Sequence, residues 1–390
     1  MIRIERGPAP DSLTLARDEH LARARLRGRA PNTSEVTGYE VAHEALMPRQ
    51  AYKCAYCELY ARNEAAPVEH YRPKGRAHDV NWRGLKKRPD KTATDADRED
   101  DARFARGLPP RREGFERVQW VERSGYWWLA WTWGNLVFGC TGCNTGVKNT
   151  RFPQTASARA LAEHDDPPGR ESPLLLDPAS NDPADDPIDH IRFMQVHRRW
   201  LPVARDGSPR GGWTIALLRL DSSPALLTAY GERVRALENA VASLDTAHTA
   251  GSSAIRGAWD ALLAAELAPH VTLLGLTYDW LDARYPEAWR KPHGLSLPKP
   301  TLRMPDEWHA SLPIAPPDVA DLPDRVADLV RVARNFQTLT GQRAQPSVEQ
   351  MPLAELVAEV LKHRPAATDQ DLAVLLNRSV SVIRGARTDG

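Results

Sequence analysis

Apolar residues recur at helical spacing over two long stretches in the second half of the chain. In residues 213–247 and 254–284 they return every three to four positions, as a helix with one buried face requires. The positions are Leu217, Leu220, Leu226, Leu227, Val234 and Leu237, then Trp259, Leu262, Leu263, Leu267, Leu273 and Leu276. Residues 11–50 contain shorter helical pieces, with apolar positions such as Leu13 and Leu46. The pattern therefore predicts a mainly α-helical chain.

Three stretches lack this periodicity. Residues 75–123 are rich in Arg, Lys, Asp and Gly and poor in aliphatic side chains, which predicts a long, partly mobile insertion. Residues 155–190 are rich in Asp and Pro, so we expect them to wrap over a surface instead of building a core. Residues 285–323 contain many prolines and are interpreted as a semi-rigid linker.

The C-terminal segment has the pattern of a helix-turn-helix. Thr368 is expected to cap a first helix, and a turn at Asn377 leads into a second one. On that second helix Ser381, Arg384 and Arg387 would face DNA. A small helical module that docks onto a protein explains the same pattern equally well.

Composition adds limits on location and partners. The chain has 390 residues and a net charge of +1, with Arg and Lys gathered in 72–88 and 103–123 and Asp in 90–101 and 165–189. A basic surface beside an acidic one suits a protein that holds phosphates in one place and a partner in another. We expect no membrane segment and a cytoplasmic location, because no apolar run is long enough for a signal core or a bilayer span.

All four cysteines of the chain fall into two pairs with C-x-x-C spacing. Cys54 and Cys57 form the first pair, and Cys140 and Cys143 form the second. Each pair can present two thiolates to a metal, and two pairs complete a tetrahedron. The spacing therefore predicts a structural Zn²⁺ site.

Candidate chemistry lies between and behind these pairs. Glu69 and His70 follow Val68 at the end of a predicted short strand; a carboxylate can bind a hard cation while a neutral imidazole takes a proton from water. Asn144 follows the second pair and either caps a helix or offers its amide oxygen to a metal; Lys148, one turn later, could meet a phosphate. The tryptophan-rich run 126–133 is interpreted as core packing, with base stacking as the alternative.

These motifs together resemble the HNH, or ββα-metal, endonucleases, and more narrowly the PtuB-like HNH nuclease subunit of Septu and retron-associated anti-phage defence systems. The resemblance covers about the first 235 residues. It rests on Gly7-Pro8 with Ser12-Leu13, Gln50 with Cys54-Ala55-Tyr56-Cys57-Glu58, Glu69-His70-Tyr71-Arg72-Pro73-Lys74, Trp133-Gly134-Asn135-Leu136, Cys140 to Asn144 with Lys148, Phe152-Pro153, Pro173 to Pro178 with His190, and Trp213-Thr214-Ile215 with Leu218-Arg219-Leu220.

The resemblance implies a role for each matching residue. His70 would be the general base, and Asn135 would fix the turn that orients it. Glu69 and Asn144 would hold one catalytic Mg²⁺ or Mn²⁺. The implied phosphate-binding residues are Arg72, Lys74 and Lys148.

Two features depart from the family pattern. The third motif position, often His, is Asn144, whose amide oxygen suits a hard cation but contributes no charge. The insertion at 75–123 is long for so compact a motif, and His78 inside it is an alternative ligand, although a surface histidine is the simpler interpretation.

The resemblance also implies a partner and a function. It suggests a metal-dependent endonuclease that cleaves nucleic acid, with DNA as the favoured substrate, as the effector of a bacterial anti-phage defence system. An ABC/SMC-like (PtuA-like) ATPase subunit would be its partner, onto which the later helices would dock; packing within the chain explains these helices equally well. Two alternatives remain: an RNA- or tRNA-cleaving HNH effector, and a non-catalytic zinc-stabilised protein that binds DNA and recruits others.

The expected fold is α+β, with a small zinc-stapled ββα-metal core inside a mainly α-helical protein and a helical, HTH-like module at the C-terminus. The expected layout is a helical segment at 1–50, the HNH core at 51–155 with its insertion at 75–123, a wrapping and helical docking region at 156–284, a linker at 285–323, and the C-terminal module at 324–390.

Overall fold

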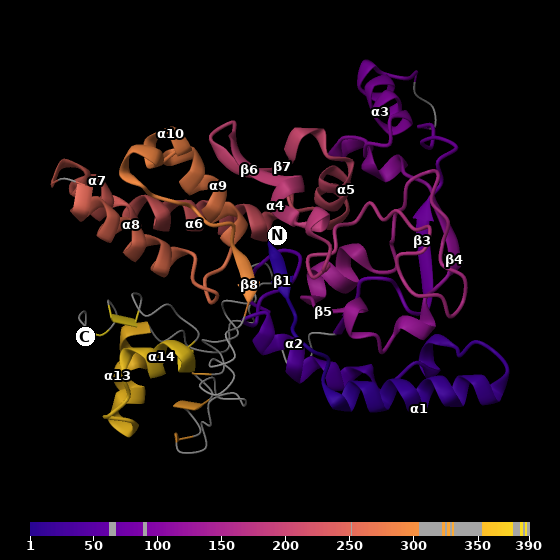
Figure 1. The fold of residues 1–390 in the computed structure, drawn as a ribbon, viewed down its shortest axis with the longest axis horizontal. Helices are drawn as coiled ribbons and strands as arrows, with labels where there is room; N and C mark the ends of the chain where they lie inside the picture. Colours follow the sequence, from indigo (N-terminus) through magenta and orange to yellow (C-terminus); the bar gives the residue numbers. More distant parts are fainter. Residues whose placement is uncertain are drawn as a thin grey trace. The chain divides into compact units, whose positions relative to one another are not determined.

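The computed structural model describes residues 1–61, 68–88, 92–250, 252–303 and 353–376, together with 322–323, 326–327, 330, 383–384 and 387. The chain divides into two units (Figure 1). The first comprises residues 1–61 and 65–304, and the second 62–64 and 305–390. Each unit is described by itself below.

The first unit mixes helices with short paired strands, as an α+β fold requires. Its four sheets among the described residues are two-stranded. The pairs are β1 (Arg3–Glu5) with β8 (Thr301–Arg303), β2 (Val68–His70) with β5 (Leu136–Phe138), β3 (Arg76–Val80) with β4 (Trp120–Ser124), and β6 (Ile191–Val196) with β7 (Arg199–Ala204). Only β1 and β8 run parallel; the other three pairs are antiparallel.

Two helices precede the first cysteine pair, as the sequence pattern predicts. They are α1 (Asp11–Arg27) and α2 (His43–Arg49), and the short helical turn η2 (Tyr39–Ala42) leads directly into α2. Leu13 on α1 and Leu46 on α2 are buried, whereas Leu15 is exposed. Val41 on η2 is exposed as well, so the apolar positions of this region identify the helices but not reliably their buried face.

The insertion at 75–123 differs from the expectation of a partly mobile segment. Its described residues form β3, α3 (Asp95–Ala105) and β4, with β3 and β4 side by side in Figure 1. Few aliphatic residues are needed, because Phe104 packs with Trp82 and with Trp213 from far along the chain. Buried Arg117 also pairs with Asp97 at 3.3 Å. The segment's own aromatic and aliphatic residues supply most of this core, and Leu174 and Trp213 from outside the segment complete it.

A series of helices occupies residues 209–284 of the first unit. They are α5 (Pro209–Leu218), α6 (Pro224–Ala240), α7 (Ala242–Ala250), α8 (Ser252–Glu266) and α9 (Leu274–Arg284). The predicted helical periodicity is confirmed, and positions such as Leu237, Trp259 and Leu276 are buried within the unit. The chain itself therefore covers these apolar positions. Among the helices of the described residues, none combines the length and the apolar character that crossing a bilayer demands.

Residues 285–303 do not behave as the start of a linker. They form α10 (Glu287–Arg290), the turn η9 (Lys291–His293) and β8. The expectation failed because β8 finds its hydrogen-bonding partner in β1 at the beginning of the chain, which proline content alone does not indicate. The prolines at 313, 316 and 317 lie outside the described residues.

The second unit contains α13 (Leu353–His363) and α14 (Asp369–Leu376). Its apolar cluster includes Leu356, Val360, Leu372 and Ile383. Thr368 caps α14 as predicted: its Oγ1 accepts a hydrogen bond from the Asp371 amide at 3.1 Å. The described residues thus give the first helix of the expected helix-turn-helix; most of the second lies outside them.

Candidate metal and catalytic site

The four cysteine sulfurs converge on one point of the first unit. All lie within 4.8 Å of one another, and the sulfurs of Cys57 and Cys140 are 3.9 Å apart. A tetrahedral zinc ion with Zn–S bonds of about 2.3 Å separates its sulfurs by about 3.8 Å. The cluster therefore fits a structural Zn²⁺, as the spacing predicts.

The backbone around the first pair is shaped for this cluster. The Glu58 amide donates to the carbonyl of Cys54, and Glu58 itself adopts a left-handed backbone with φ of 60°. Buried Gln50 then fastens the pair to β5, since its side chain exchanges hydrogen bonds of 2.8 and 2.9 Å with the backbone of Phe138. Gln50 thereby connects the segment of the first cysteine pair to the strand that precedes the second pair.

The strand pair β2–β5 carries Glu69 and His70. Glu69 pairs with Val137 and His70 with Leu136. Because side chains alternate along a strand, those of Glu69 and His70 leave β2 on opposite faces. The two predicted site residues thus stand on either side of one short strand.

Glu69 is buried, 3% exposed, and has a cationic partner. Its Oε1 lies 2.6 Å from Nζ of Lys148 and accepts a longer hydrogen bond, 3.4 Å, from the Tyr56 hydroxyl. Burial raises the pKa of the Glu69 carboxyl, and Lys148 opposes that rise. Since Lys148 is itself fully buried, it bonds to the protein and not to an exposed phosphate site.

Gly139 leaves space between Glu69 and Asn144. A Cβ placed on Gly139 would lie 3.1 Å from Cβ of Glu69 and 3.7 Å from Cβ of Asn144. Within the described residues, the side-chain amide of Asn144 has no hydrogen-bonding partner. The side chains of Glu69 and Asn144 therefore begin close together at Gly139, and a carboxylate and an amide are ligand types that a hard divalent cation takes.

His70 is held by hydrogen bonding and by ring packing. Its Nε2 lies 3.1 Å from the carbonyl oxygen of Ala130, which can only accept, so Nε2 carries the proton and Nδ1 keeps its lone pair. The ring of Tyr39 packs edge-on against the imidazole at 4.5 Å. Burial, with smaller effects of Lys74 and Lys148, lowers the pKa of His70 to about 3. The imidazole is therefore neutral at physiological pH.

Asn135 fixes the backbone that follows His70. Its Oδ1 accepts from the amide of Arg72 at 2.8 Å, and its Nδ2 donates to the carbonyl of Arg72 at 3.1 Å. Its own carbonyl accepts from the amide of Tyr71. With 1% of its surface exposed, Asn135 acts entirely within the protein.

The other two predicted phosphate ligands also have protein partners. Arg72 is buried and its Nε lies 2.7 Å from a carboxylate oxygen of Glu171. Lys74 places its ammonium 3.5 Å from the ring centre of Tyr39, and burial lowers its pKa to about 8. Of the three predicted cations, Lys74 is the one beside the ring that covers His70.

The alternative ligand and the tryptophans have structural partners. His78 lies on β3, with Nδ1 2.8 Å from the hydroxyl of Thr150. Trp127, Trp128 and Trp131 are buried, so packing, the favoured interpretation, is confirmed for them. Trp131 also donates to the carbonyl of Thr37, which ties the N-terminal region to the site.

In the second unit, the arginines predicted to face DNA bind a carboxylate. Arg387 and Arg384 both pair with Asp369, at 2.6 and 3.3 Å. Ser381 lies outside the described residues. A role of these side chains in DNA binding stays a prediction.

Three contributors were not assigned a role from the sequence. Tyr39 covers His70, Tyr56 binds Glu69, and Gln50 joins the first cysteine pair to β5. Gln50 and Tyr56 lie within the resembling motifs, whereas no local signal at Tyr39 marks it, because its neighbour His70 is distant in sequence.

Comparisons with known proteins bear on the resemblance. No protein-family model matches the chain, and no solved structure matches it. Among curated proteins, the Septu protein PtuB of Bacillus mycoides (strain KBAB4) is 34% identical over 116 residues. These residues are 29% of this chain and 35% of PtuB, so the match spans about a third of that relative's length. The predicted resemblance to a PtuB-like Septu protein is confirmed over this stretch.

Proposed function

We propose that this chain is a metal-dependent endonuclease of the HNH type that hydrolyses phosphodiester bonds. The observation that carries the proposal is the meeting of Glu69 and Asn144 around Gly139, beside the four-cysteine cluster. The neighbouring strand residue, His70, has a fixed tautomer with a free lone pair on Nδ1. A cation-binding pair and an oriented neutral base, with Glu69 and His70 adjacent on one strand, are the groups that metal-assisted hydrolysis requires.

In the proposed reaction, Nδ1 of His70 removes a proton from a water molecule. The water oxygen forms a bond to phosphorus, and the bond from phosphorus to the leaving oxygen breaks. Glu69 and Asn144 would hold a divalent cation such as Mg²⁺ or Mn²⁺, which stabilises negative charge on the phosphate and leaving oxygens. The Ala130 carbonyl keeps the imidazole oriented, and Asn135 keeps the chain beyond it in place.

Access to this base requires a movement. His70 is only 7% exposed, and Tyr39 packs against its ring. We infer that the segment carrying Tyr39 shifts when nucleic acid binds. Lys74, whose ammonium lies over the ring of Tyr39, then becomes available to a phosphate. The structure in this view is a closed state of the enzyme.

The biological setting is proposed from the similarity to a Septu protein. We propose an effector of anti-phage defence that works with an ATPase partner and acts on DNA. RNA is the alternative substrate, because the attacked phosphodiester is common to both and no reader of the 2′-hydroxyl is evident.

The decisive experiment compares His70→Ala with the matched control His78→Ala. The full chain is purified alone and with its partner, supplied with Mg²⁺ or Mn²⁺, and assayed on DNA and on RNA. Loss of the general base should lower the cleavage rate by about 100-fold or more. His78→Ala should cleave normally, because His78 lies on β3 and binds Thr150 in the turn after η6 (Gly142–Lys148). Full activity of His70→Ala, with zinc content unchanged, would refute the proposal.

The competing function is a non-catalytic zinc-stabilised module that binds DNA. The observation that favours it is the neutralisation of Glu69 by buried Lys148. It predicts that His70→Ala and Glu69→Ala retain full biological function, whereas Cys54→Ser loses it through loss of the zinc-supported fold. Phage-protection assays on these three variants separate the two functions.

A further inference from the structure

Lys148 connects the two residues on which the proposed chemistry depends. Its ammonium lies 2.6 Å from Oε1 of Glu69 and donates to the backbone carbonyl of His70 at 2.9 Å. It is the last residue of the π-helical turn η6 (Gly142–Lys148), which also carries Asn144. One short helical turn thus supplies both the amide beside Glu69 and the cation that binds Glu69.

This turn has the geometry of a specialised element. The amide of Asn149 donates to the carbonyl of Asn144 across five residues, at 2.5 Å. Such π-type turns are rare in proteins, and those that occur are often found at functional sites. Here the wide turn brings Asn144 and Lys148, four positions apart, to the neighbourhood of one carboxylate.

Stability alone does not explain the pair. Burying a carboxylate and an ammonium costs desolvation energy that their attraction often only balances, so an apolar pair would stabilise the core at least as well. Lys148 is 0% exposed and Glu69 3%. Both polar contacts of the carboxylate fall on Oε1, from Lys148 and from Tyr56. The described part of the chain offers Oε2 no hydrogen bond.

We propose that Lys148 is a resident counter-charge for Glu69 that weakens the binding of a divalent cation until the ammonium is displaced. The inference rests on the proposed role of Glu69 as a cation ligand. A positive charge this close to a ligand oxygen repels an incoming dication strongly in a buried site. Its displacement also withdraws a hydrogen bond from the backbone of His70, so cation binding and the position of the base are coupled.

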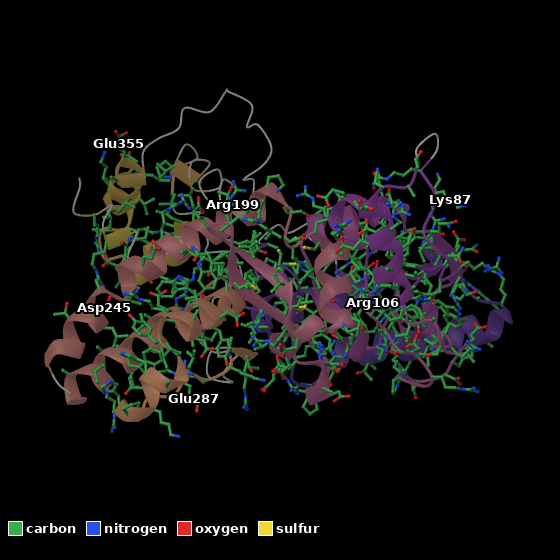
Figure 2. All side chains as sticks on the ribbon, turned by 90° about the horizontal axis from the view of Figure 1, so that it is seen from above. Lys87, Arg106, Arg199, Asp245, Glu287 and Glu355 are labelled. Carbon is green, nitrogen blue, oxygen red and sulfur yellow. The ribbon has the colours of Figure 1, made fainter. Side chains whose placement is uncertain are left out.

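The test measures Mn²⁺ binding to the zinc-loaded full chain by electron paramagnetic resonance. Lys148→Met removes the charge and is expected to tighten binding by about tenfold or more. The control Lys87→Met removes the charge of an exposed lysine, labelled in Figure 2, and should leave the affinity unchanged. The double variant Glu69→Gln/Lys148→Met should lose the gain.

Equal affinity of Lys148→Met and the unaltered chain, or a gain that persists in the double variant, would overturn the proposal. Lys148→Gln is the second variant, because its neutral amide can still donate to Glu69 and to the His70 carbonyl; it should also bind Mn²⁺ more tightly. If both single variants lose zinc and helical circular dichroism, Lys148 is a folding residue and the proposal is wrong.

Failure of the nuclease proposal gives a different result. If the chain cleaves no nucleic acid but Lys148→Met still tightens Mn²⁺ binding through Glu69, the counter-charge proposal stands and the endonuclease proposal is wrong.

Discussion

At the scale of single residues, the site is built from buried polar side chains whose partners are largely backbone groups. Asn135 bonds both backbone groups of Arg72, and Gln50 does the same for Phe138. An unsatisfied buried polar group costs about 1–3 kcal/mol, so each such residue fixes one local geometry. These side chains fasten short strands that have few ladder bonds of their own.

Asp279 gives a prediction on pH and stability. It lies on α9, accepts from the amide of Phe193 at 2.7 Å, and pairs with Arg205 at 2.8 Å. Burial raises its pKa from 3.8 to about 6. The folded chain therefore binds this proton more tightly than the unfolded chain, and stability falls as the pH rises through that interval.

The measurement is the free energy of unfolding of the unaltered chain minus that of Asp279→Asn. This difference should decrease by about 2–3 kcal/mol between pH 4 and pH 6 and then level off. Subtraction removes the pH dependence of the zinc site, which both chains share. Asp206→Asn, at an exposed position, is the control and should give a flat difference. A flat difference for Asp279→Asn as well would contradict the raised pKa.

At the scale of elements, the charged insertion shows how a segment with few aliphatic residues can fold around aromatic side chains, completed by residues from elsewhere in the chain. Phe104 on α3 is 3% exposed and stacks with Trp82 at 4.9 Å. Trp213 on α5, fully buried, completes the packing and donates to the carbonyl of Gly107. The hairpin β3–β4 and α3 thus depend on a helix about a hundred positions further along the chain.

Phe104→Ala tests this dependence. Removing a buried phenyl ring leaves a cavity and is expected to lower the free energy of unfolding by about 3–5 kcal/mol, measured in denaturant. Arg106→Ala, at the exposed residue that follows the last residue of α3, is the matched control. It should change the free energy of unfolding by less than about 0.5 kcal/mol. If Phe104→Ala costs no more than the control, α3 is not part of the cooperative core.

At the scale of the whole molecule, the cysteine cluster joins the beginning and the middle of the first unit. The first pair follows α2, and the second pair follows β5 and opens the turn that carries Asn144. Because structural zinc contributes its binding energy to folding, the metal should stabilise everything between the pairs, including β2 with Glu69 and His70.

Removal of zinc is therefore expected to unfold the first unit. A strong chelator, or Cys54→Ser, should abolish bound zinc and lower the melting temperature, followed by circular dichroism together with metal analysis. Adding zinc back to the chelated chain should restore the transition, whereas Cys54→Ser should not recover. A chelated chain that melts at its original temperature without zinc would show that the cluster has no structural role.

The sequence by itself determined the features that depend on local spacing. Cysteine spacing predicted the four-sulfur cluster, helical periodicity predicted α5 to α9, and the residues around Val68 predicted β2. Thr368 was identified as a cap from its residue type alone. Each of these signals acts over a few neighbouring residues, so no distant partner is needed to recognise it.

Only the tertiary structure decided which distant groups meet. In the structure Lys148 pairs with Glu69, Arg72 pairs with Glu171, and Tyr39 packs on His70. Lys148 and Arg72 had both been predicted to bind phosphate. It also ordered the charged insertion and paired β8 with β1. A charged side chain has the same local pattern whether it meets a ligand or an internal counter-ion, because the choice depends on the burial and charge of residues far away in sequence.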